Sequence, residues 1–250
     1  AMQLLDPEAL QVTAEGDVYQ LDDSREPQEL VVSHLERHRP NWPVPETPGE
    51  LSDRQAEVAS GMQKLLRIDP SVPVPPAEQT THRVGDGREV TGHVLHPEPG
   101  IRLPGVLIEP HPPAETLTWQ RRAADGEGWE DFSRRMRSGS FVLYLNDGGK
   151  DALLSDEIVV DSLLNRGYSI FAVDLRGMGE TLPGMEGSLL DFLIGRPIVG
   201  QRTRDVLSAV RWLTRQQADQ ISIWADGPAS SLAAAGAAVF DEGIEHLVLE

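Results

Sequence analysis

The feature that most constrains this fold is a regular alternation of short apolar runs and longer amphipathic segments after residue 140. The runs are rich in aliphatic side chains, which is typical of strands buried on both faces of a sheet. The segments between them carry apolar residues at helical spacing. We predict strands at 141–145, 169–174, 221–224 and 246–249, and helices at 155–166, 201–216 and 229–240. This order indicates right-handed βαβ crossovers, and hence an α/β fold with a mostly parallel twisted sheet and helices on both faces.

The chain before and around this alternation divides into three parts. We expect an N-terminal arm with a proline-rich linker at 1–50, a helical lead-in at 51–79, and the α/β domain at 80–250. Strands at 88–96 and 105–110 are expected to form an antiparallel start to the same sheet.

Smaller elements are expected inside these parts. In the arm they are short strands at 10–13 and 18–21, a helix around Leu30 to Leu35, and a proline-rich linker at 40–48. In the domain they are a polar surface insertion at 112–139 and a short apolar helix or lid-like segment at 186–194. The linker is expected to be extended, because proline fixes φ and biases the preceding residue away from helix.

The overall composition excludes several classes of function. The chain has 22 basic and 40 acidic residues, a formal net charge of −18, which disfavours binding to nucleic acids and to anionic membranes. It has no cysteine, which excludes disulfides, thiolate catalysis and cysteine-ligated metals. From the acidic start of this sequence we expect no signal peptide, and no apolar run approaches the ~20 residues that span a bilayer. The compartment stays open, and an exported parent protein is one of the options.

Active groups of open α/β sheets lie at the carboxyl ends of the strands, and three such ends are candidates here. After the first strand, the glycines of 146–150 fit either an oxyanion hole or a flexible turn. A phosphate loop is excluded because Asp151 follows Lys150 where Ser or Thr is required. After the second strand, 174–180 resembles only part of a dinucleotide fingerprint, so no cofactor is predicted. We expect Asp174 and Arg176 to pair and fix this loop.

The third strand end has the pattern of a nucleophile elbow, a sharp turn between a strand and a helix. Small residues flank the turn, with Ala225 and Ala229 at the glycine positions of G-x-S-x-G. The serine position is Gly227, flanked by Asp226 and Pro228, and glycine has no side chain that could attack a substrate. We therefore predict no catalytic residue.

Three nearby side chains are possible substitutes for the nucleophile. Ser230 and Ser231 lie inside the helix start, where capping or packing is their natural role. Asp226 could serve as a carboxylate nucleophile only with a shifted register.

The histidines give neither a catalytic base nor a metal site. Of the seven, only His246 follows the elbow, at the start of a strand where a hydrolase histidine is not expected. The acid and histidine of such a triad normally come from strands that would follow Glu250. His93 and His96 lie three residues apart on a strand and so point to opposite faces, which argues against a metal pair.

Two stretches carry a resemblance to a known family. Residues 171–181, together with 193–202 leading into 205–213, resemble acetyl xylan esterase-like α/β-hydrolases. The resemblance covers about residues 80–250. It implies the α/β fold derived above, a twisted sheet with helices on both faces, without the last strands of the family's sheet. Members of this family act on ester bonds through a serine, an acid and a histidine. Of these catalytic positions, only that of the serine can be matched to this sequence, and it is Gly227.

The arm adds a second resemblance. Residues 10–18 look like the linker of large bacterial proteins that carry two such domains in tandem, the second of them degenerate. This implies that the chain is the second domain and that an active tandem hydrolase domain is its partner.

Three functions remain open on this sequence. The first is a non-catalytic hydrolase-like domain that supports or binds within a larger esterase-type protein. The second is an ester hydrolase whose site is completed by residues beyond this chain, and the third is a protein-interaction module using the proline-rich stretch. A sheet ending at 246–249 leaves an open edge, so we expect a dimer through that edge or further strands of the parent covering it.

Overall fold

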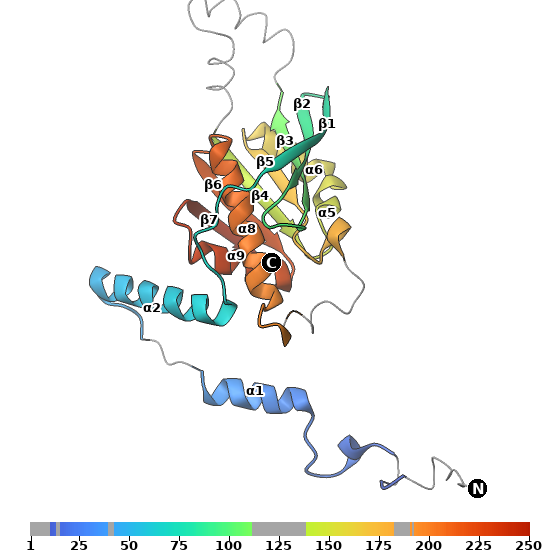
Figure 1. The fold of residues 1–250 in the computed structure, drawn as a ribbon, viewed down its shortest axis with the longest axis vertical. Coiled ribbons are helices and arrows are strands. Elements are labelled where there is room, and N and C mark those ends of the chain that lie inside the picture. The colour runs from blue at the N-terminus through green and yellow to red at the C-terminus, as the bar shows by residue number, and fades with distance from the viewer. Residues whose placement is uncertain (1–10, 14–15, 40–42, 112–138, 183–190, 192) are drawn as a thin grey trace, which may run out of the picture. The chain divides into compact units, whose positions relative to one another are not determined.

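The structure is a computed structural model that describes residues 11–13, 16–39, 43–111, 139–182, 191 and 193–250 (Figure 1). The insertion predicted at 112–139 lies outside the described residues except for Gly139, and of the apolar segment predicted at 186–194 the structure describes Asp191, Leu193 and Ile194. The chain forms two compact units, 1–50 and 51–250, and each is described by itself.

The N-terminal unit contains a 3₁₀ helix, η2 (Val18–Gln20), and an α-helix, α1 (Pro27–Arg37). The helix predicted around Leu30 is confirmed. The strand predicted at 18–21 is wrong, because the Asp17 carboxylate accepts the Tyr19 amide at 2.9 Å and turns the chain into η2. The described residues 11–13 of the other predicted strand are not in a strand either.

The second unit is built on one seven-stranded sheet with the order β1-β2-β3-β5-β4-β6-β7. The strands are β1 (Ala77–Gly85), β2 (Arg88–Leu95), β3 (Leu103–Pro110), β4 (Ser140–Asn146), β5 (Ser169–Val173), β6 (Gln220–Asp226) and β7 (Ile244–Leu249). β1, β2, β3 and β5 pair antiparallel, and β5, β4, β6 and β7 pair parallel. The predicted mostly parallel strands with an antiparallel start are confirmed.

Helices cover both faces of this sheet (Figure 1). They are α5 (Asp151–Leu154) and α6 (Glu157–Asn165) on one face, and α8 (Ile198–Arg215) and α9 (Pro228–Ala238) on the other. The chain also has α2 (Pro48–Leu66), of which Leu66 is buried, and a short 3₁₀ helix, η3 (Gly179–Thr181). The helix predicted at 155–166 is confirmed as α6, which begins two residues later than predicted. The chain makes α5 first, and α6 begins after Asp156, whose carboxylate accepts the Val159 amide at 3.1 Å.

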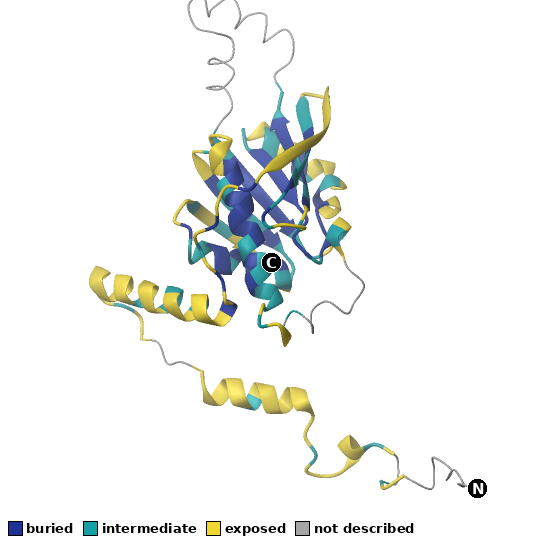
Figure 2. Cartoon of the chain, viewed as in Figure 1, coloured by how far each residue is buried: buried dark blue, intermediate teal, exposed yellow. Residues whose placement is uncertain are grey.

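The core has two layers because successive side chains of a strand point to opposite faces. Leu143 and Ile223 pack on the face covered by α8 and α9, whereas Tyr144 and Ile170 pack with α5 and α6. Figure 2 shows that the central strands and much of α8 are buried, whereas the edge strand β1 is exposed. This arrangement fixes the carboxyl ends of β5, β4 and β6 side by side.

The end of α2 packs so closely on α8 that only glycine fits at the contact. A Cβ on Gly200 would collide with the carbonyl oxygen of Leu66, which is buried in the core. We expect Gly200→Ala to lower the free energy of unfolding by about 1–3 kcal/mol through overpacking against backbone. Urea unfolding followed by circular dichroism measures this change.

Gly61 provides the matched control, since it lies exposed within α2 and a methyl group added there would have no neighbour within 4 Å. There Gly61→Ala is expected to stabilise by up to about 1 kcal/mol through helix propensity. Stabilisation by both substitutions would contradict the close contact at Gly200.

Candidate functional site

The turn between β6 and α9 is formed by Gly227, with φ 102° and ψ 151°. This is a region of backbone conformation that essentially only glycine adopts. The Gly227 amide donates to the Glu250 carbonyl at 3.0 Å, and its carbonyl accepts the Ser231 amide at 2.9 Å. The structure thus places Gly227 at the apex of a strand–turn–helix unit, where its α-carbon carries no reactive group.

The loop after β4 lies against this turn because β4 and β6 are neighbours, with Asn146 level with Asp226. The Asp147 carboxylate accepts the amide of Ala229 at 3.1 Å and that of Ser230 at 2.7 Å. A Cβ on Gly227 would lie 2.5 Å from Cγ of Asp147. Asp147 therefore caps α9 from outside and fills the space beside Gly227. Sequence reasoning missed this role, since the loop was expected to be an oxyanion hole or a flexible turn.

The backbone donors around this turn are already engaged. In an elbow of this kind the oxyanion is bound by the N–H after the nucleophile and by an N–H from a neighbouring loop. The residue after Gly227 is Pro228, which has no N–H. The loop amides all donate within the protein: Asp147 to the Asp226 carbonyl at 3.1 Å, Gly148 to Asn146 Oδ1 at 2.7 Å, Gly149 to the Asn146 carbonyl at 2.9 Å, and Lys150 to Asp174 Oδ1 at 2.6 Å.

The three substitute nucleophiles are also engaged with neighbours. The Asp226 carboxylate accepts Nδ2 of Asn146 at 2.7 Å. Ser230 is buried, with its hydroxyl 3.8 Å from the sulfur of Met178, and the Ser231 hydroxyl donates to the Glu250 carbonyl at 3.2 Å. Ser230 therefore packs in the interior, as its position in the helix start suggested.

The candidate histidines do not meet at the turn. His246 is exposed on β7, and the ring of His93 lies against that of Trp212, with centroids 4.8 Å apart. Nε2 of His96 lies 3.3 Å from a carboxylate oxygen of Glu78. Within the part of the chain that the structure describes, no group of three or more potential ligands could hold a metal ion. No described helix is long and apolar enough to cross a membrane.

The expected pair of Asp174 with Arg176 is wrong. Asp174 Oδ2 accepts the Lys150 ammonium at 2.8 Å, and Arg176 donates from Nε to Asp205 on α8 at 2.8 Å. The loops after β4 and β5 lie side by side, which brings Lys150 to Asp174, whereas Arg176 meets Asp205 on α8. Burial by itself lowers the pKa of Lys150, but bonding to Asp174 and Glu180 raises it overall and keeps the ammonium charged.

The Asp147 carboxyl is held in its charged form. Burial by itself raises its pKa, but hydrogen bonds from Ser230 and from the Ala229 amide, together with the charge of Arg202, bring the pKa below its ordinary value. Because the pKa is depressed on folding, the charged form stabilises the protein above the unfolded pKa of about 3.9, and this stabilisation is lost as pH falls through the folded pKa.

We expect Asp147→Asn to cost about 0.3–1 kcal/mol of stability at neutral pH, because the helix end loses its negative charge. The difference from the parent should shrink as pH falls below about 3.9. Unfolding by denaturant at a series of pH values measures it. Asp22→Asn, an exposed site in the N-terminal unit, makes the same change of charge and should leave the unfolding of the second unit unchanged at every pH.

Comparison with known proteins places this fold. No protein-family model matches the sequence, and no curated protein matches it either. Among solved structures, the chain is similar to a candidate acetyl xylan esterase from Bacteroides fragilis NCTC 9343, with 14% identity, a TM-score of 0.62, and 91% of this chain covering 61% of that one. It is also similar to the methylesterase BT1017, with 13% identity, a TM-score of 0.56, and 88% of this chain covering 44% of that one. The fold is therefore α/β-hydrolase-like, and the chain spans less than two thirds of the length of these structures.

Proposed function

We propose that this chain is a non-catalytic α/β-hydrolase-like domain that supports or binds within a larger esterase-type protein. The observation that carries the proposal is the Asp147 carboxylate beside Gly227, bonded to the amides of Ala229 and Ser230. A negative group held there repels the negative charge that develops on an ester carbonyl during attack.

Two further features support this proposal independently. The elbow position is Gly227, so the turn lacks an attacking atom. Pro228 removes the first oxyanion donor, and loss of one such donor costs about 10²–10³-fold in rate in a serine hydrolase. Three different residues thus change the site. Gly227 removes the attacking atom, Pro228 removes an oxyanion donor, and Asp147 fills the space beside the turn.

The second candidate function is an ester hydrolase whose site is completed outside this chain. The esterase fold and the retained strand–turn–helix unit favour it. For that function a reactive group from elsewhere would have to approach Gly227 and displace Asp147 from α9.

The two functions are separated by treating the chain with a fluorophosphonate probe and by measuring p-nitrophenyl acetate hydrolysis. We expect neither labelling nor hydrolysis above that of buffer. Labelling of Ser230 or Ser231 would contradict the proposal. So would hydrolysis that disappears in Asp226→Ala, since Asp226 directly precedes the turn residue Gly227.

The proposed partner is an active hydrolase domain of the same parent protein. A dimer through β7 is the alternative, because Val248 and Leu249 on this edge strand are about half exposed. We favour the tandem domain, since a second copy would bring its own net charge of −18.

A further inference from the structure

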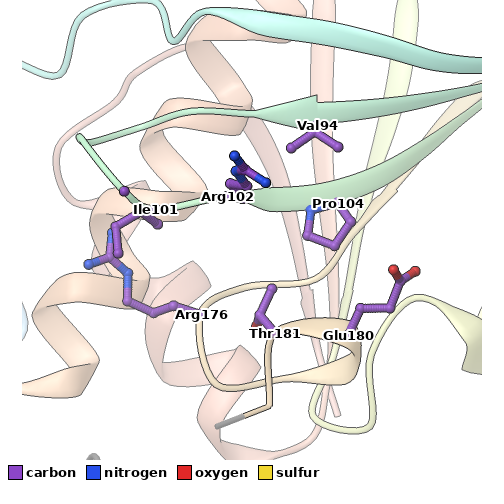
Figure 3. Close-up of a pocket in the computed structure, with 8 residues that line it drawn as sticks. Val94, Ile101, Arg102, Pro104, Arg176, Glu180 and Thr181 are labelled. Atoms are coloured by element: carbon purple, nitrogen blue, oxygen red, sulfur yellow. The ribbon is translucent and has the colours of Figure 1, made fainter.

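A pocket of about 460 Å³ lies between the segment entering β3 and the loop that follows β5. Val94, Ile101 and Pro104 form its apolar wall, and Arg102, Glu180 and Thr181 supply polar groups (Figure 3). In the figure, Arg102 and Pro104 stand on one side, and Glu180 and Thr181 on the other. The volume is within the range of sites for small organic ligands.

Most polar groups of this pocket already have partners inside the protein. The Arg176 guanidinium donates to Glu98 at 2.9 Å as well as to Asp205. The Thr181 hydroxyl is bonded to the Leu175 carbonyl at 2.5 Å, and Glu180 is bonded to the Lys150 ammonium.

Arg102 is different, because it is exposed at the pocket and no described residue serves it as a hydrogen-bonding or ionic partner. An arginine presents a rigid fork of donors that matches a carboxylate with two parallel hydrogen bonds. The guanidinium of Arg102 is therefore the group in the pocket that is available to a ligand.

We propose that this pocket binds a small organic monocarboxylate with an apolar body. The carboxylate meets Arg102, and the apolar body lies against Val94, Ile101 and Pro104. A more highly charged anion is disfavoured, since the Glu98 and Glu180 carboxylates lie close by. The site does not use Gly227 or Asp147, so it stands whether or not the elbow is catalytic.

Hexanoate is a suitable probe, and an NMR titration of the whole chain gives its dissociation constant. For a ligand this small we expect binding on the order of millimolar. Arg102→Gln should weaken hexanoate binding about tenfold or more, because a charge-assisted pair is lost at an exposed position that does not support the fold. Hexanol, which has no charge, should bind the parent more weakly by a similar factor.

Arg83→Gln is the matched control, an exposed arginine at the other end of the antiparallel strands, level with Val90 rather than Val94. It should bind hexanoate like the parent. Equal hexanoate binding by Arg102→Gln and the parent would overturn the proposal, as would the lack of saturable binding. Inorganic phosphate binding as tightly as hexanoate would overturn the apolar part of the recognition. Circular dichroism verifies that each variant is folded.

Discussion

Replacing Arg176 by methionine is expected to lower the free energy of unfolding by about 3–5 kcal/mol. The Asp205 carboxylate is fully buried and accepts Nε of Arg176 at 2.8 Å and its backbone amide at 3.1 Å. Methionine fills much of the arginine volume but leaves this carboxylate without its counter-charge in the interior. Denaturant unfolding monitored by tryptophan fluorescence measures the loss.

Two further variants identify its cause. Arg83→Met changes an exposed arginine in the same way and should alter stability by no more than about 0.5 kcal/mol. The double variant Arg176→Met, Asp205→Leu removes both charges and should recover most of the loss, because a buried ion pair is often replaceable by apolar residues. A double variant as unstable as the single one would show that the shape of this site, and not the unpaired charge, is what matters.

The sequence predicted the strands of the sheet correctly, but it did not predict the partner of Arg176. The strands were predictable because runs such as 141–145 are apolar throughout, and a run of that length is typical of a strand within a sheet covered on both faces. Polar pairing was not predictable in the same way. Asp174 and Arg176 are neighbours in sequence, yet their partners Lys150 and Asp205 lie 24 and 29 residues away. Strand order decides the first pair and the packing of α8 the second, and local sequence pattern encodes neither.

The same limit explains why Asp147 was missed. Its position after a strand and before two glycines indicated a loop, and the sequence offered no sign that it caps a helix beginning 81 residues later, at Pro228. The parallel register that sets Asn146 beside Asp226 makes the contact. By contrast, Gly227 could be placed at the turn from sequence, because small residues on both sides of a strand–helix junction are a local pattern.

Gly227→Ser is expected to destabilise the protein by about 2–5 kcal/mol, through strain at a φ of 102° and overpacking against Asp147. Serine at this position supplies the hydroxyl that the elbow frame calls for, yet its Cβ needs the space that the Asp147 carboxylate fills. The free energy of unfolding in urea, compared with that of the parent, measures the cost.

A double-mutant cycle with Asp147→Ala tests whether the two residues exclude each other. Alone, Asp147→Ala should cost about 0.5–2 kcal/mol, since two amides of α9 lose their cap. In the Gly227→Ser background, Asp147→Ala should lower the free energy of unfolding by less than it does in the parent, or even raise it. The expected coupling energy between the two substitutions is about 1–3 kcal/mol. Strict additivity would mean that the collision with Asp147 does not limit this position. Even the double variant should not hydrolyse p-nitrophenyl acetate, because Pro228 still withholds the first oxyanion donor, and a hydroxyl without that donor has little to stabilise the charge it creates.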